Sequence, residues 1–249
     1  MNPFHPASAG ADTTKLVLLS MVATSCMLAH QVAGKAARDG FFLLQFPATD
    51  LPKMVVTAAL LSFGLAALFG RLLERIGPRQ LVPVAFTLSA VLHLAEWMAV
   101  SQQPRATAIL IYLHIVGLGA ILLSGFWSLL SELFDPREAK RRFGRIAAAG
   151  TGGGILGGIA AERLGAWTYT NHLLLLLAFL HLACAALAYS LHTPGSYSPK
   201  HYETVTAREA FHRTPLIWRL AALVFISTCS ASLLDYLFKQ GASAALGKG

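Results

Sequence analysis

Seven long apolar runs, separated by short polar connections, constrain what this chain can fold into. They cover residues 16–34, 55–72, 81–100, 109–130, 146–167, 172–191 and 216–238. Crossing the hydrocarbon core of a bilayer takes roughly 20 apolar residues in a helix, and each run is about that long. In a helix every backbone polar group is paired within its own segment, as lipid requires. The runs therefore predict an all-α integral membrane protein with seven transmembrane helices.

The composition supports a membrane protein and argues against other classes. Hydrophobic residues make up 55% of the 249 residues and charged residues only 13%, which lies outside the range of soluble domains. The formal net charge is +8, but the basic residues lie in short loops and form no single soluble face. Nucleic-acid binding is therefore not expected. The distribution of Lys and Arg among the loops places the N-terminus in the cytoplasm.

The chain shows no pattern typical of an enzyme or a cofactor site. Cys26, Cys184 and Cys229 lie inside apolar runs without CxxC spacing, so neither a disulfide framework nor a metal site is predicted. His93 and Glu96 form an HxxE pair, which has the wrong order for the HExxH of metalloproteases. No nucleophile and base stand in a catalytic pattern. We therefore expect no enzyme, no cofactor and no metal.

The longest polar connection, residues 192–215, is rich in Ser, Pro, Thr and charge. It separates a cytoplasmic N-terminal segment (1–15) and a six-helix domain (16–191) from a further part (216–249) that holds helix seven. A repeat of six helices interrupted in this way predicts a fragment of a twelve-helix protein. A second half, or a soluble extension, is then expected to be missing from this chain.

The loop between the second and third runs reads G-R-L-L-E-R-I-G-P-R, residues 70–79. It resembles the loop signature of the major facilitator superfamily, with Glu74 in the place of the acid and Pro78 where a base is usual. The resemblance implies a facilitator-type six-helix bundle plus helix seven. It also implies a cytoplasmic gate formed by Gly70, Glu74, Arg75 and Gly77. Any turn rich in Gly and Arg remains the alternative interpretation.

The next cytoplasmic loop runs from Phe134 to Gly144 and reads F-D-P-R-E-A-K-R-R-F-G. Together with K-A-A-R-D followed by F-F-L at residues 35–43, it resembles the nucleotide (ATP:ADP) antiporter family and its bacterial relatives. The resemblance implies ATP/ADP exchange by alternating access in a bacterial-type inner membrane, with Asp135 and Arg137 in the gate. Asp135 can also cap the following helix. The basic run has an alternative role as an anchor on anionic lipid.

The fifth run is rich in glycine. Gly150, Gly154 and Gly158 recur every four residues, with Gly153 and Gly157 beside them, so one helix face has almost no side chains. Such a face predicts close packing against a partner helix. The Lys and Thr that a phosphate-binding loop needs are absent.

Polar residues inside the runs are the candidate substrate site, because hydrocarbon disfavours them unless they face a cavity or a partner. On the first helix, Gln31, Lys35 and Arg38 follow one helical stripe with a cationic end just past the apolar run. This end suits phosphate or carboxylate. The alternative is that Lys35 and Arg38 reach the membrane interface and pair with nearby acids.

Three further helices contribute candidates. The antiporter resemblance implies a carboxylate on the fourth helix, but His114 stands near the expected place, which puts nucleotide exchange in question. An offset of about two hundred residues aligns the first run with the seventh and adds Asp235 and Lys239, which can pair. His93 and Glu96 share a face, either as a proton-carrying pair or through interfacial hydrogen bonds. His181, among Leu and Ala, is expected to be structural.

These observations favour a secondary transporter of an anionic solute, in particular a nucleotide, that works by alternating access in the lipid bilayer. The alternative is a membrane sensor or scaffold that keeps the bundle without transporting.

Overall fold

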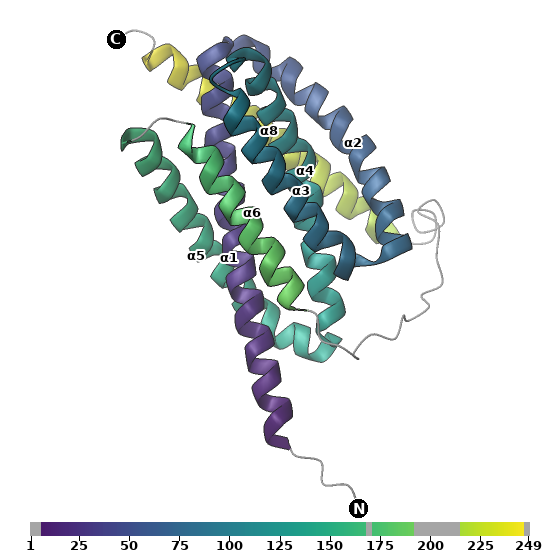
Figure 1. Ribbon diagram of the computed structural model, residues 1–249. Helices are drawn as coiled ribbons and strands as arrows, with labels where there is room; N and C mark the ends of the chain where they lie inside the picture. Colours follow the sequence, from purple (N-terminus) through teal and green to yellow (C-terminus); the bar gives the residue numbers. More distant parts are fainter. Residues whose placement is uncertain (1–5, 168–170, 192–214, 247–249) are drawn as a thin grey trace, which may run out of the picture. The chain divides into compact units, whose positions relative to one another are not determined.

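The computed structural model describes residues 6–167, 171–191 and 215–246. Its regular elements there are helices, which confirms the predicted all-α membrane fold (Figure 1). They are α1 (Pro6–Gln45), the short 3-10 helix η1 (Ala48–Asp50), α2 (Leu51–Ile76), α3 (Pro78–Ala99), α4 (Pro104–Leu133), α5 (Pro136–Trp167), α6 (His172–Ser190) and α8 (Pro215–Leu246).

The chain divides into two compact units. The first comprises Met1–Phe46 and Met54–Gly195, and the second comprises Pro47–Lys53 and Ser196–Gly249. In the first unit, α1 packs along α5, α6 and α4, and α3 packs along α6 and α4. In the second unit, η1 packs on α8, whose apolar side chains are mostly exposed.

Six helices in the described residues are long and apolar enough to cross a membrane, and they correspond to six of the seven predicted segments. The predicted fifth transmembrane segment is not among these six helices. Residues 146–167 are helical as part of α5, but α5 does not reach the same hydropathy. Its glycines, together with Glu162 and Arg163, replace the large apolar side chains that the other spans carry.

Two apolar clusters form the core of the first unit. One contains Val17, Ala23 and Met27 of α1 with side chains of α3, α4 and α6. The other contains Ala33, Ala37 and Phe41 of α1 with side chains of α4 and α6. The side chains of α1, α3, α4 and α6 that lie between the two clusters are polar. They form the candidate site described below.

The contact between α1 and α5 is made by backbone as well as by side chains. A Cβ atom added at Gly153 would overlap the carbonyl oxygen of Ser25, and one at Gly157 would overlap that of Ala29. The Ser25 Oγ also donates a hydrogen bond of 2.8 Å to the carbonyl oxygen of Ala149. The helices therefore meet at Gly153 and Gly157, where a larger residue has no room.

The other three glycines of the predicted packing face lie beside this contact. A Cβ at Gly150 would come within 2.8 Å of the Thr24 Cγ2. At Gly154 and Gly158 the nearest atoms belong to Val32, at 3.4 and 3.5 Å, which are ordinary contact distances.

Candidate functional site

A buried polar layer separates the two apolar clusters of the first unit. Each of its side chains comes from a helix long and apolar enough to span the membrane, and each is at most 5% exposed. We define the polar layer as His30 of α1, Ser89, His93 and Glu96 of α3, His114 of α4 and His181 of α6.

The carboxylate of Glu96 stands at the centre of the layer and accepts two hydrogen bonds. On one side, the Nδ1 of His93 lies 2.8 Å from the Glu96 Oε2. The Nε2 of the same ring lies 3.0 Å from the Nε2 of His30. This first arm of the network therefore connects α3 to α1.

The second arm starts at the other carboxylate oxygen. The Nδ1 of His114 lies 2.8 Å from the Glu96 Oε1, and the Nε2 of His114 lies 2.7 Å from the Ser89 Oγ. The Ser89 Oγ is also 2.8 Å from the Nδ1 of His181. This arm connects α3 to α4 and α6, so the network joins four helices.

The direction of each hydrogen bond follows from the carboxylate, which is an acceptor only. His93 must donate from Nδ1, so its Nε2 carries a lone pair and accepts from His30. His114 likewise donates from Nδ1 and accepts at Nε2 from the hydroxyl of Ser89, which in turn accepts from the Nδ1 of His181. Neutral imidazole has one donor and one acceptor nitrogen. A lone pair is therefore left on His30 Nδ1 and on His181 Nε2.

These two end nitrogens are buried and have no hydrogen-bond partner among the described residues. The rings that carry them are stacked, with centroids 3.4 Å apart and planes inclined by 16°. Burying an imidazole lone pair without a partner costs roughly 1–3 kcal/mol. The layer thus combines an enclosed negative charge with two lone pairs that lack a partner, and both features favour a bound cation.

The predicted stripe on α1 lies partly against α4. The Nε2 of Gln31 donates a 3.0 Å hydrogen bond to the carbonyl oxygen of Gly119, and Lys35 is exposed. The Nε of Arg38 donates to the Asp39 Oδ1 at 2.8 Å, as the interface interpretation expected, and its guanidinium carbon lies 4.9 Å from the ring centre of Tyr112.

The remaining predicted substrate residues lie elsewhere. His114 belongs to the polar layer and is 5% exposed, so it faces Glu96 and Ser89 instead of the α1 stripe. Asp235 and Lys239 form an ion pair on α8, in the second unit.

The predicted gating residues lie at helix ends. Glu74 and Arg75 are exposed near the end of α2, and a Cβ added at Gly70 would meet nothing within 4 Å. Gly77 has φ of 74° and ψ of 159°, a conformation that is essentially restricted to glycine.

Asp135 and Arg137 lie in the other predicted gate, at the start of α5. The Asp135 Oδ1 accepts from the backbone N–H groups of Arg137 and Glu138, at 2.8 and 3.0 Å, and so caps the helix. Arg137 is exposed and lines a pocket of about 350 Å³ with other residues of the basic run, namely Glu138, Arg141, Arg142 and Arg145.

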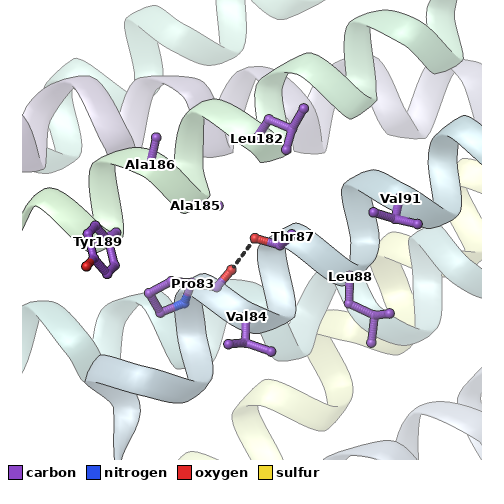
Figure 2. Close-up of a pocket in the computed structure, with 9 residues that line it drawn as sticks. All are labelled: Pro83, Val84, Thr87, Leu88, Val91, Leu182, Ala185, Ala186 and Tyr189. Carbon is purple, nitrogen blue, oxygen red and sulfur yellow. Dashed lines mark hydrogen bonds between the residues drawn. The ribbon is translucent and has the colours of Figure 1, made fainter.

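A second groove, of about 660 Å³, runs between α3 and α6 (Figure 2). Its lining is mostly apolar, and the hydroxyl of Thr87 donates to the carbonyl oxygen of Pro83 in its own helix. Tyr189 is the other lining residue with a hydroxyl group, and no lining residue is charged. The lining residues are Pro83, Val84, Thr87, Leu88, Val91, Leu182, Ala185, Ala186 and Tyr189.

Two members of the polar layer were not expected from the sequence to be functional. His181 was expected to be structural, but it bonds Ser89 and stacks on His30. His30 was not singled out, because it belongs to no motif. A usable signal exists: each of four apolar runs contains a histidine, and an ionisable residue inside a membrane needs a partner.

Comparison with known proteins adds the family. No curated protein and no solved structure matches the chain significantly. The model of the Major Facilitator Superfamily matches residues 18–244, which is most of the chain. The chain therefore belongs to the major facilitator superfamily, as a multi-pass membrane transporter and not an enzyme.

Proposed function

We propose that this secondary transporter carries a small anionic solute by alternating access, with nucleotides such as ATP and ADP as the first candidates. We further propose a bacterial-type inner membrane with the N-terminus in the cytoplasm, as the distribution of basic residues favours. The proposal that the solute is an anion rests on the arrangement of Arg38 on α1.

The guanidinium of Arg38 is held in place on two sides. Its Nε donates to Asp39, and its guanidinium carbon lies over the ring of Tyr112 of α4. The two terminal nitrogens bond no acceptor among the described residues. They form the end of the fork that binds carboxylate or phosphate in a bidentate manner. The side chain is 15% exposed, so part of the guanidinium is accessible to an anion.

The surroundings of Arg38 suit an anion that binds and leaves better than one that stays bound permanently. Asp39 already neutralises part of the charge of Arg38, so the net attraction is moderate. Lys35 precedes Arg38 by about one helical turn and supplies a second cation on α1. Because Tyr112 belongs to α4, a shift between α1 and α4 would change how the fork is presented. Alternating access requires such a dependence of binding on conformation.

Uptake into proteoliposomes tests this function. The full chain is reconstituted, and labelled ATP, ADP, inorganic phosphate and a dicarboxylate are offered in turn with and without internal unlabelled solute. We expect accelerated uptake of at least one anion. Loss of a hydrogen bond to a charged group costs about 1.5–3 kcal/mol. Arg38→Ala should therefore weaken binding of that anion about 10- to 100-fold.

Two variants make the result specific. Arg38→Lys keeps the charge but loses the fork, so its affinity should fall between those of the wild type and Arg38→Ala. Arg163→Ala removes a cation at an exposed position of α5 and should leave affinity unchanged. Equal affinities for Arg38→Ala and Arg163→Ala would exclude Arg38 as the anion site. Binding of an anion without uptake would favour a sensor or scaffold instead of a transporter.

A further inference from the structure

We propose that the polar layer binds one divalent transition-metal ion of the kind that prefers imidazole, such as Zn²⁺ or Co²⁺, through His30, His93 and His181. This site does not depend on anion transport, because its occupancy can be measured in protein that moves nothing.

The donor nitrogens are already close together. One ring nitrogen from each of the three histidines lies within 4.8 Å of the others, and the Nε2 atoms of His30 and His93 are 3.0 Å apart. Zinc binds histidine nitrogen at about 2.0–2.1 Å in a tetrahedron, which places two ligand nitrogens about 3.4 Å apart. The three nitrogens therefore lie close to the spacing of zinc ligands, although the rings have to turn before all three can bind one ion.

The hydrogen-bond network prepares lone pairs for a metal. Glu96 holds the Nδ1 proton of His93, which leaves a lone pair on the His93 Nε2. A metal ion bound there takes the place of the hydrogen bond from His30. This carboxylate–histidine–metal arrangement is the common outer shell of zinc sites. Ser89 holds the Nδ1 proton of His181 and leaves its Nε2 bare. His30 has one lone pair in either neutral tautomer, so no proton has to leave the layer.

A metal ion satisfies the layer better than an additional proton. A proton taken up by either arm would change an unpaired acceptor nitrogen at its end into an unpaired donor, so the buried group would still lack a partner. A metal ion gives such a nitrogen a bond. It also places positive charge near the Glu96 carboxylate, which the two apolar clusters separate from water.

A second group of donors, His93, Glu96 and His114, is equally close, but the two imidazole nitrogens that face Glu96 carry the protons of its hydrogen bonds. Each carboxylate oxygen accepts an imidazole N–H at 2.8 Å. Coordination by these two Nδ1 atoms would require both protons to leave and would break both hydrogen bonds. The three-histidine group keeps them, and it also uses an end nitrogen that has no partner.

Binding has a conformational consequence. Imidazole binds a metal in the plane of its ring, whereas His30 and His181 are stacked with nearly parallel planes. Coordination by both therefore requires the stack to open. The bound ion would then join α1, α3 and α6 at one point.

Spectroscopic titration tests the site. The full chain is produced without a polyhistidine tag, stripped with a chelator in detergent and titrated with Co²⁺, whose visible absorption reports imidazole coordination. We expect one tightly bound Co²⁺ per chain, displaced by Zn²⁺ but not by Mg²⁺, which prefers oxygen ligands. His181→Asn should weaken Co²⁺ binding at least tenfold. Glu96→Gln, which alters only the outer shell, should weaken it about 10- to 100-fold.

His172→Asn is the matched control, because His172 is an exposed histidine on the same helix as His181. It should bind Co²⁺ as the wild type does. Equal affinities in His181→Asn and His172→Asn would overturn the proposal, as would a wild type with no Co²⁺ spectrum, which would mean that the layer holds only protons. If His181→Asn does not fold, unchanged affinity in Glu96→Gln overturns the proposal in the same way.

Discussion

Two neighbouring glycines of α5 give a sharp test of the contact between α1 and α5. A Cβ at Gly157 would lie 2.6 Å from the Cα of Ala29 and would overlap its carbonyl oxygen. A Cβ at Gly158 would lie 3.5 Å from the Cγ1 of Val32, which is an ordinary contact. The atoms of Ala29 belong to a helix backbone and cannot turn away. Alanine at 157 therefore has to push the helices apart by about 1 Å, to a separation near 3.5 Å.

The expected free-energy change combines two effects. Overpacking costs about 1–3 kcal/mol, and a backbone overlap belongs at the upper end of that range. Replacing glycine by alanine in a helix contributes up to about 1 kcal/mol in the opposite direction, equally in both variants. Gly157→Ala should therefore destabilise the protein by about 2 kcal/mol, whereas Gly158→Ala should be neutral or stabilising. The difference of about 2–3 kcal/mol isolates the packing effect.

The assay is reversible unfolding of the full chain in mixed micelles with increasing SDS, followed by circular dichroism and tryptophan fluorescence. Gly152→Ala is a third variant, because a Cβ there would meet nothing within 4 Å, and it should behave like Gly158→Ala. If Gly157→Ala and Gly158→Ala unfold with the same free energy, the backbones of α1 and α5 do not meet at this position.

Three further predictions use the same unfolding assay. Gly77→Ala should cost about 1–3 kcal/mol, because the backbone conformation there excludes other residues while the site itself is open; no loss would mean that the turn adopts another conformation. Asp135→Ala should cost about 1 kcal/mol through loss of the α5 cap, and Asp135→Asn should restore most of it; equal losses would exclude capping. Ser89→Ala should cost about 2–4 kcal/mol, because it leaves two imidazole nitrogens unpaired. Its control, Ser128→Ala, removes only an exposed bond within one helix, so equal effects would contradict the network.

The helices of this fold follow directly from the apolar runs, but their ends do not. The run 16–34 lies inside α1, which continues to Gln45. Hydropathy marks the part of a helix that suits lipid, whereas the helix itself continues through Lys35 and Arg38, which are good helix formers. The fifth run shows the opposite limit, because α5 is helical although its glycines lower its hydropathy.

The polar layer could be predicted only in part. His93 and Glu96 are close in sequence, and their shared face was visible. The partner of His181 is Ser89, which lies 92 positions away, and the partner of His93 on α1 lies 63 positions away. Such pairs depend on the rotation of each helix about its axis, which a single sequence does not fix. His114 illustrates this, because its hydrogen bonds are made to Glu96 and Ser89 of α3.

The position of His30 has a consequence for how the protein is made. During synthesis α1 enters the membrane first, and its histidine is then in lipid without its later contacts. His93 arrives with α3, and the stacked ring of His181 arrives only with α6. An unpartnered polar group in hydrocarbon is unfavourable. The early helices are therefore expected to remain loosely associated, or close to the insertion machinery, until α6 has been inserted. The first six helices would then reach their final packing in one late, cooperative step.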